Sequence, residues 1–379
     1  MNTLTKLTTV ILLLLLNLQS HAEEKFKLHG HYSQGYAISS GSTIWGIPDD
    51  GTFDYRSIGL QFSFHPAEKH SVYFQMRHRR LGRNPLMRAT DDVSYDWGFY
   101  KYEFSDNSSI QIGKMLRPFG IYSEISDVGV LLPFYQATYP LYFEGNFTSK
   151  TYNGVALSHE IEFWDDWNFH VDIFAGEYQF NEWYIFKNPL SGEREELVGE
   201  VKVRNSIGLW TWLNTSIEGF RIGVGGNQAD FREGIQYVQN GLIGHEKVQI
   251  WHSSIDLTRA RWFLRSEQSY IYMYTNDFDG FGSTTQLSFE PIEAVRLNCQ
   301  YEFLNIRNAP VASASGATRS DFDYHRDAAI GISYNKQNKF TLKLETHWNR
   351  SLSIEEPISF TEENPPSTFY TIFSISGAF

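Results

Sequence analysis

The chain has 379 residues, a net charge of −12 and a single cysteine, Cys299. The acidity argues against nucleic acid as a partner, and one cysteine excludes both an intrachain disulfide framework and a cysteine zinc site. Aromatic residues make up 16% of the chain, yet its mean hydropathy is negative. This combination is typical of a transmembrane barrel, whose strands face lipid on one side and water on the other. A secreted, soluble, aromatic-rich β-protein that binds glycans is the alternative.

The chain begins with the pattern of a secretory signal peptide. Lys6 precedes the apolar run Val10 to Leu16, and Ser20-His21-Ala22 supplies small residues at the cleavage position. The apolar run is too short to span a bilayer whose hydrocarbon core is about 30 Å thick. We therefore expect residues 1–22 to be removed after export and residues 23–379 to form one outer-membrane β-barrel.

From Phe26 onward, apolar and polar residues alternate along most of the chain. Successive side chains of a strand point to opposite faces, so each run predicts a strand with one apolar and one polar face. The apolar sets include Leu28, Tyr32 and Ile38; Ile58, Leu60 and Phe62; Val72 and Phe74; Phe169, Val171 and Ile173; Val201, Val203, Ile207 and Leu209; Leu297, Cys299 and Tyr301; and Leu342, Leu344 and Trp348. The phase of residues 93–104 and 248–259 is ambiguous.

Short and long connections between these runs alternate along the chain. The long ones are predicted near residues 39–52, 80–92, 117–150, 177–198, 231–247, 275–283, 307–322 and 353–367. Short turns at one rim, long loops at the other and an even strand number are typical of outer-membrane barrels. The sheet must close, because lipid cannot satisfy an open edge. The expected fold class is all-β, a transmembrane antiparallel β-barrel of about 16 strands.

The last predicted strand, Thr368 to Phe379, reads TFYTIFSISGAF. Phe369, Phe373 and Phe379 share its apolar face. An aromatic end in phase with the lipid face resembles the C-terminal signal of bacterial outer-membrane proteins. The resemblance implies that Phe379 is recognised by the barrel assembly machinery.

A barrel of this width leaves an aqueous lumen, so the inward polar faces are the expected functional surface. The inward basic residues in this register are Arg77, Arg79, Lys202, Arg204, Arg221, Arg261, Arg265, Arg296 and Lys343. The inward acidic residues are Glu160, Glu162, Asp172, Glu267, Glu302 and Glu345. The basic excess predicts a field that attracts anions. The alternative is that these side chains are solvated or paired with neighbouring carboxylates.

Residues 117–150 form the longest connection. Roughly 34 residues without a sustained period exceed an ordinary connection, and loops of this length are usually functional or disordered. The segment is too aromatic and apolar for a disordered linker. It is therefore expected to be an ordered loop packed on or inside the barrel.

The start of this loop resembles a known family. Gln111-Ile112-Gly113-Lys114 followed by Arg117-Pro118-Phe119-Gly120 is similar to the G-[RK]-x-x-x-P-F-G segment of the bacterial outer-membrane porin superfamily, in particular phosphate-selective-type porins. The resemblance implies a third loop folded into the lumen, and a homotrimer. It implies that Lys114 and Arg117 lie near the constriction, opposite acidic loop residues, which departs from a lysine-rich phosphate filter. The expected pore and constriction residues are Lys114, Arg117, Glu124, Asp127, Glu144, Arg77, Arg79, Arg261, Arg265 and Arg296.

Other motifs point to no chemistry. No nucleophile–base constellation stands out, so we expect no enzyme, no cofactor and no metal site, and we interpret His29 and His31 as solvated lumen residues. Tryptophans near predicted strand ends are expected to form interface girdles: Trp164, Trp167, Trp210, Trp212, Trp251 and Trp348.

The predicted function is a porin for passive diffusion of small polar solutes and ions across the outer membrane. The expected partners are outer-membrane lipids and lipopolysaccharide, the assembly machinery, the solutes and two further copies of the chain. Two alternatives stay open. One is a porin selective for an anion or organic acid, and the other is an outer-membrane enzyme or adhesin on a barrel scaffold.

Overall fold

The computed structural model describes residues 25–88, 92–142, 149–163, 166–187, 191–233, 246–274, 277–313, 316–336, 340–352 and 367–379. The predicted signal peptide, Glu144 and Trp164 lie outside these ranges. Within them, no helix has the length and apolar character that crossing a bilayer requires.

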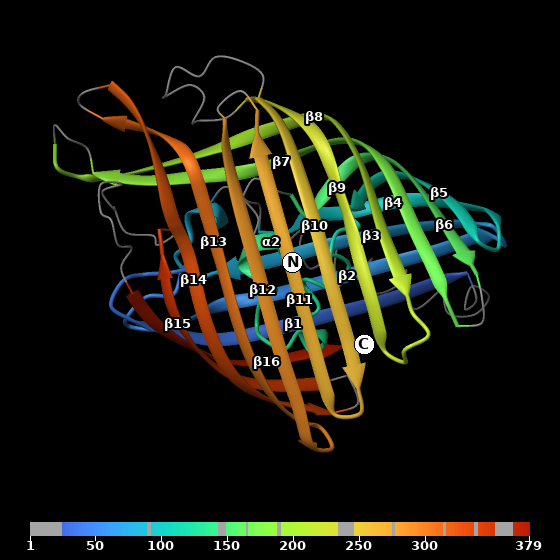
Figure 1. The fold of residues 1–379 in the computed structure, drawn as a ribbon. Helices are drawn as coiled ribbons and strands as arrows, with labels where there is room; N and C mark the ends of the chain where they lie inside the picture. Colours follow the sequence, from blue (N-terminus) through green and yellow to red (C-terminus); the bar gives the residue numbers. More distant parts are fainter. Residues whose placement is uncertain are drawn as a thin grey trace, which may run out of the picture.

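Sixteen strands form one closed antiparallel sheet (Figure 1). They are β1 (Phe26–Ser40), β2 (Thr52–Ala67), β3 (His70–Leu81), β4 (Ser94–Ser105), β5 (Ser108–Leu116), β6 (Thr151–Glu162), β7 (Asn168–Lys187), β8 (Arg194–Asn214), β9 (Phe220–Glu233), β10 (Glu246–Arg259), β11 (Trp262–Met273), β12 (Phe278–Ile292), β13 (Val295–Ser313), β14 (Gly316–Lys336), β15 (Phe340–Ser351) and β16 (Ser367–Ala378). Each pairs with its neighbours in the chain, and β1 pairs with β16. Gly30 and Phe379 exchange both backbone hydrogen bonds at 2.9 Å where the barrel closes. The predicted fold class and strand number are confirmed.

The distribution of polar and apolar side chains on the two faces of the sheet is the reverse of that in a soluble protein. Large apolar side chains are exposed on the outside, for example Ile112 (54%) and Ile330 (68%). Charged side chains of the opposite face are buried, for example Glu302 (4%) and Glu345 (3%). Because only lipid favours such an exposed apolar surface, the outer face is a membrane-facing band.

Three of the predicted long loops are wrong in extent. The hairpins β7–β8, β11–β12 and β13–β14 continue as strands through most of residues 177–198, 275–283 and 307–322. β7 and β8 have 20 and 21 residues, whereas about 10 residues cross a membrane as a tilted strand. The extra length is backbone pairing beyond the membrane, where side chains need not alternate in polarity, so the sequence pattern does not reveal it.

A bulge in β8 reverses the predicted facing of its first half. The β8–β9 register shifts between Arg204 and Ile207, and Asn205 has a φ of 52°. A bulge adds one residue and turns the following side chains to the other face. Val203 is therefore buried on the inside while Ile207 is 65% exposed outside. The prediction that Lys202 and Arg204 face the lumen is wrong, because both lie on the outer face.

Two of the predicted girdle tryptophans lie in β8 beyond the bulge, on the face opposite the outward Ile207 and Leu209. Trp210 is fully buried and contacts Trp212 on the inside of the barrel. Trp251 and Trp348 are about half exposed on the outer face, as an interface girdle requires. The girdle prediction is thus wrong for the two β8 tryptophans.

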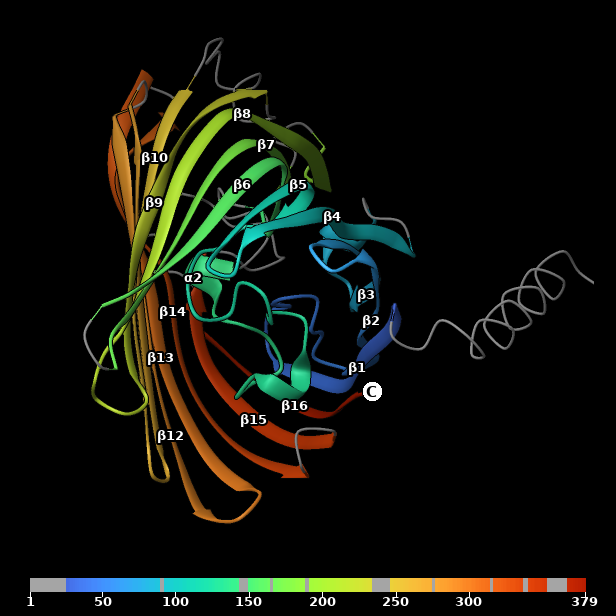
Figure 2. The same ribbon diagram turned by 90° about the vertical axis from the view of Figure 1, so that its right-hand side faces the viewer.

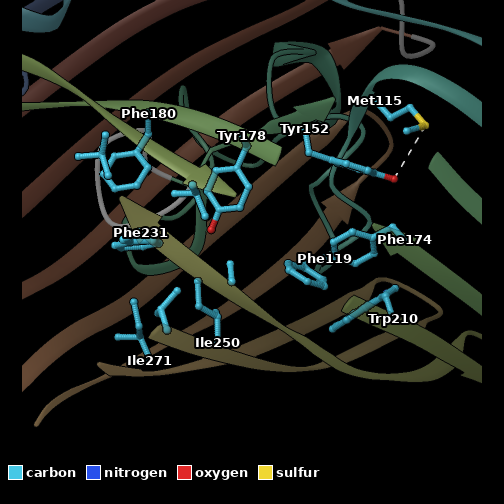
Figure 3. Packing of buried hydrophobic residues seen from close by; sticks show 14 of the residues in the cluster. Met115, Phe119, Tyr152, Phe174, Tyr178, Phe180, Trp210, Phe231, Ile250 and Ile271 are labelled. Atoms are coloured by element: carbon cyan, nitrogen blue, oxygen red, sulfur yellow. Dashed lines mark hydrogen bonds between the residues drawn. The ribbon is translucent and has the colours of Figure 1, made fainter. Parts of the chain in front are cut away.

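Local irregularities also explain the two ambiguous runs. The β3–β4 register shifts beside Asp96, so Asp96 and Trp97 are both buried although they are adjacent. In β10, Val248 and Ile250 face inward like the polar residues that follow them. They belong to an internal aromatic cluster that includes Met115, Phe119, Tyr152, Phe174, Tyr178, Phe180, Trp210, Phe231 and Ile271 (Figure 3). The inner face is therefore apolar in this region, which sequence alternation alone does not predict.

Candidate pore constriction

The connection between β5 and β6 lies against the inner wall of the barrel. It contains η3 (Gly129–Leu131) and α2 (Tyr139–Tyr142), and Figure 2 shows α2 on the concave side of the sheet. α2 contacts β11, β12 and β13, whereas η3 contacts β1, β15 and β16. The described part of this connection therefore reaches several strands far from it in the sequence.

Inward wall residues hold the backbone of this loop. Carboxylates accept hydrogen bonds from loop N–H groups: Glu267 from Ile121 (2.7 Å), Glu302 from Tyr139 (3.2 Å) and Glu345 from Tyr135 (2.7 Å). The ammonium of Lys343 donates to the carbonyl oxygens of Gly129 (2.6 Å) and Phe134 (2.7 Å). A loop without regular structure must pair its buried backbone groups with side chains or water. The wall supplies these partners, so the loop is docked at several points.

An ion-pair network fastens the loop to β3 and β4. Arg77 lies 3.5 Å from both Asp96 and Asp127, and Lys150 lies 3.1 Å from Asp96 and also pairs with Asp127. The exposed fractions of these side chains lie between 5% and 13%. Asp127 and Lys150 come from the loop, while Arg77 and Asp96 come from the wall. The network contains equal numbers of positive and negative groups, so it is neutral as a whole.

The electrostatic surroundings keep Asp127 ionised. Burial alone would raise the pKa of Asp127, but the charges of Lys150, Arg77 and Arg79 outweigh it and hold the pKa well below its usual range. The network therefore stays intact at neutral and mildly acidic pH.

A cavity lies between this network and the wall of β1–β3. Its lining includes Ser33, Ser57, Arg79, Asp127, Tyr135 and Lys150. Loop and wall both contribute polar groups to this cavity.

A second ionic contact joins the loop to β9–β11. Arg265 donates to the Tyr122 hydroxyl (2.9 Å) and lies 3.4 Å from Asp256. Arg221 also pairs with Asp256 (2.9 Å) and stacks on Trp212. Burial raises the pKa of Tyr122 to about 12, so its hydroxyl stays protonated. Arg265 is confirmed as an inward residue, but its charge is shared with a carboxylate.

Glu124 is the exposed acidic group among the described residues of the loop. It faces His170 and Asp172 of β7 and Arg221 of β9 within the barrel. The surrounding protein, and then the charge of Asp172, raise its pKa above the ordinary value of 4.5. Both signs of charge therefore meet around Glu124.

The structure corrects the predicted places of Lys114 and Arg117. Lys114 has the same strand parity as the exposed Ile112, and its ammonium donates to the Tyr95 carbonyl on the outer face (3.2 Å). Arg117 is 5% exposed and stacks on Phe119 and Tyr178. Neither faces an acidic residue of the described loop, because Asp127 pairs with Arg77 and Lys150.

Two further predicted lumen arginines lie near short turns. Arg261 is in the turn between β10 and β11 and donates to the Pro291 carbonyl (2.6 Å). Arg296 pairs with Glu290 (3.5 Å) and stacks on Phe263. Arg261 thus makes a local contact at that rim, whereas Arg296 is also close enough to Arg265 and to Tyr122 of the loop to interact with them electrostatically.

These placements change the predicted charge of the lumen. Lys202 and Arg204 leave the inward set, and Asp96, Asp256 and Asp327 join it. Most of the inward arginines named above lie beside a carboxylate. Among the described residues, the basic excess that predicted an anion-attracting field is therefore absent.

Sequence reasoning missed a buried Ser–His–Glu contact on β13–β15. His325 Nδ1 lies 3.1 Å from the Ser351 hydroxyl, and His325 Nε2 lies 3.1 Å from Glu302. All three side chains are at most 4% exposed, and Tyr139 packs on the histidine ring. A substrate cannot reach the serine in this arrangement. No local motif signals the contact, because the residues come from three strands.

The described residues contain no group of three or more His, Cys, Asp and Glu side chains placed to hold a metal. His31 is buried rather than solvated, in contrast to the prediction.

The fold and the loop define a sixteen-stranded barrel of the outer-membrane type. No family model matches the chain, and no curated protein matches it. Solved structures do. The trimer form of OmpT, an outer membrane protein of Vibrio cholerae, has a TM-score of 0.55 at 10% identity, covering 93% of this chain and 99% of that one. Salmonella typhi OmpF in complex with daunomycin has a TM-score of 0.56 at 10% identity, covering 93% and 97%. At this identity, the likeness concerns the fold.

Proposed function

We propose that the protein is an outer-membrane porin that lets small polar solutes and ions diffuse passively. The observation that supports this function best is the docking of residues 117–142 on inward wall side chains of a closed, wide barrel. A sixteen-stranded barrel has a lumen wide enough for water. A loop held across part of that lumen narrows it without closing the barrel wall.

The proposed filter has mixed charge. Loop residues Glu124 and Asp127 face wall arginines, and the paired groups leave little net field to favour one sign of ion. Rings of charged side chains set ion preference in pores. We therefore expect weak selectivity, and sieving by size as the main restriction on solutes. The lysine-rich filter of a phosphate-selective porin has no counterpart among these residues.

The proposed oligomer is a homotrimer. The supporting observations are the trimer form of the structurally similar OmpT and the broad apolar outer face of this barrel. The outer face would contact lipid and lipopolysaccharide where no partner subunit covers it.

Reconstitution in planar lipid bilayers tests the function. Purified protein should produce stepwise increases in conductance, with a cutoff in the size of neutral solutes that pass in liposome swelling. Reversal potentials in a salt gradient should be small. A bilayer that stays closed with folded protein inserted would overturn the proposal.

Glu124 should make the ion preference depend on pH. A carboxylate is charged above its pKa, so a raised pKa means that Glu124 loses its charge while the pH is still above 4.5. As the pH is lowered and Glu124 becomes neutral, the cation-to-anion permeability ratio should fall, by a factor of about three at most. Reversal potentials measured at stepped pH test this prediction. Glu124→Gln should abolish this pH dependence, whereas the control Glu103→Gln, near a short turn, should keep it. A pH dependence that persists in Glu124→Gln and disappears in Glu103→Gln would exclude Glu124 from the filter.

A further inference from the structure

A second cavity lies where both ends of the long loop meet β10. Its enclosed space is small and has room for only a few water-sized groups. The lining residues are Arg117, Phe119, Ser123, Ser126, Leu141, Tyr142, Ser149, Lys150 and His252. Seven of them offer a side-chain polar hydrogen-bonding group, and most of these are donors.

Two buried side chains of this cavity have unpartnered nitrogen atoms. Arg117 is 5% exposed, and its Nε and Nη1 atoms have no hydrogen-bond partner among the described residues. His252 is 3% exposed, and neither of its ring nitrogens has such a partner. The Phe119 ring contacts both of them, 4.9 Å from the guanidinium and 4.8 Å from the imidazole. Buried donors of this kind normally have a partner, so the cavity lacks one that the described residues do not supply.

The charge of the missing partner follows from the neighbouring ion pairs. Lys150 also lines the cavity, but Asp96 and Asp127 already balance it together with Arg77. Arg117 is left as one positive charge whose described neighbours are the Phe119 ring and the ring and hydroxyl of Tyr178, none of them a carboxylate. An isolated buried charge is strongly unfavourable. A ligand with a single negative charge would remove this penalty.

We propose that this cavity binds a small monovalent organic anion, a carboxylate of about the size of acetate. The carboxylate would accept hydrogen bonds from Arg117, from one N–H of His252 and from the serine hydroxyls, while Phe119 and Leu141 contact its apolar end. Such a ligand would join β10 to both ends of the loop. This anion site is separate from the mixed-charge filter at Glu124. Binding of a carboxylate at the anion site does not require the protein to conduct ions.

Thermal unfolding of the detergent-solubilised full-length protein tests this site. Ionic strength is kept constant with gluconate, whose chain is too long for the cavity. Saturating acetate should raise the unfolding midpoint of the wild type by about 2 °C, because a ligand that binds only the folded state stabilises it. Acetamide, which has a similar shape without the charge, should not raise it.

Variants identify the residue responsible. Arg117→Gln should lose the acetate shift, and Arg296→Gln should keep it, because Arg296 stacks on Phe263 and pairs with Glu290 elsewhere. An equal shift with acetamide, an undiminished shift in Arg117→Gln, or no shift in the wild type would each overturn the proposal. If Arg117→Gln does not assemble, the comparison of acetate with acetamide on the wild type still tests whether the site requires a negative charge. In addition, His252→Phe should weaken the acetate shift. Conductance measured on the same preparation tests the porin function separately.

Discussion

Deletion of residues Ile121–Asn146 is expected to raise single-channel conductance severalfold while the barrel still assembles. The barrel closes through continuous backbone pairing, to which the described residues of this range contribute no strand. The two ends of the loop already lie together, because the Arg117 N–H donates to the Lys150 carbonyl at 2.9 Å. A short connection can therefore replace the loop. The wall carboxylates that lose their partners would face water, where they are readily solvated.

Single-channel recording in planar bilayers measures this effect. Heat-modified mobility in gel electrophoresis shows whether the barrel has assembled. Removal of Ser191 and Gly192, which are exposed between β7 and β8, is the matched control and should leave the conductance unchanged. Unchanged conductance in the Ile121–Asn146 deletion would show that the loop does not restrict the pore.

Asp127→Asn should loosen the loop without unfolding the barrel. Asp127 is buried between Arg77 and Lys150, and removal of one partner leaves the remaining charges poorly compensated. Breaking a buried ion pair in this way destabilises a structure by about 3 kcal/mol. We expect larger and noisier single-channel currents, together with a lower unfolding temperature. Asp106→Asn, in the exposed β4–β5 turn, should change neither.

The pH dependence gives a second measure of the same contact. Since the folded-state pKa of Asp127 is depressed, its contribution to stability is present above the ordinary value of 3.8 and is lost as the pH falls below it. The noise of wild-type single-channel currents should therefore stay low at mildly acidic pH. Quiet currents in Asp127→Asn would show that other contacts hold the loop. The double variant with Lys150→Gln should be less affected than the sum of the single changes, because the two residues interact.

The barrel could be predicted because its main determinants are local. Alternation within β1, β2, β3, β13 and β15 shows directly which side chains face lipid, and the interleaved connections indicate the strand number. The prediction failed where one residue changes the phase. Asn205 places a bulge in β8, so Val203 faces inward and Lys202 and Arg204 face outward, opposite to the prediction. A bulge is an irregularity of the backbone geometry, and no residue type in that segment requires one.

The candidate constriction was only partly predictable. The unusual length and composition of residues 117–150 marked the loop, and its acidic residues Glu124 and Asp127 do lie near arginines. The pairing predicted for Asp127 was wrong, because it contacts Arg77 and Lys150 rather than Lys114 or Arg117, and Glu144 lies outside the described residues. Lys114 lies in a motif that resembles that of porins, yet strand parity places it on the outside beside Tyr95. Motif resemblance carries no information about which face a residue occupies.

By itself, the sequence determined the class of fold, the lipid-facing band and the presence of one exceptional loop. These features follow from the polarity of each residue, which determines locally whether its side chain faces water or lipid. Only the tertiary structure decided where the loop docks, because Glu302 and Glu345 meet Tyr139 and Tyr135 across separations of more than 160 residues. It also decided that Arg117 is buried beside His252, since barrel closure brings β5 and β10 to the same interior region. Contacts of this kind depend on three-dimensional proximity, which local patterns of polarity do not contain.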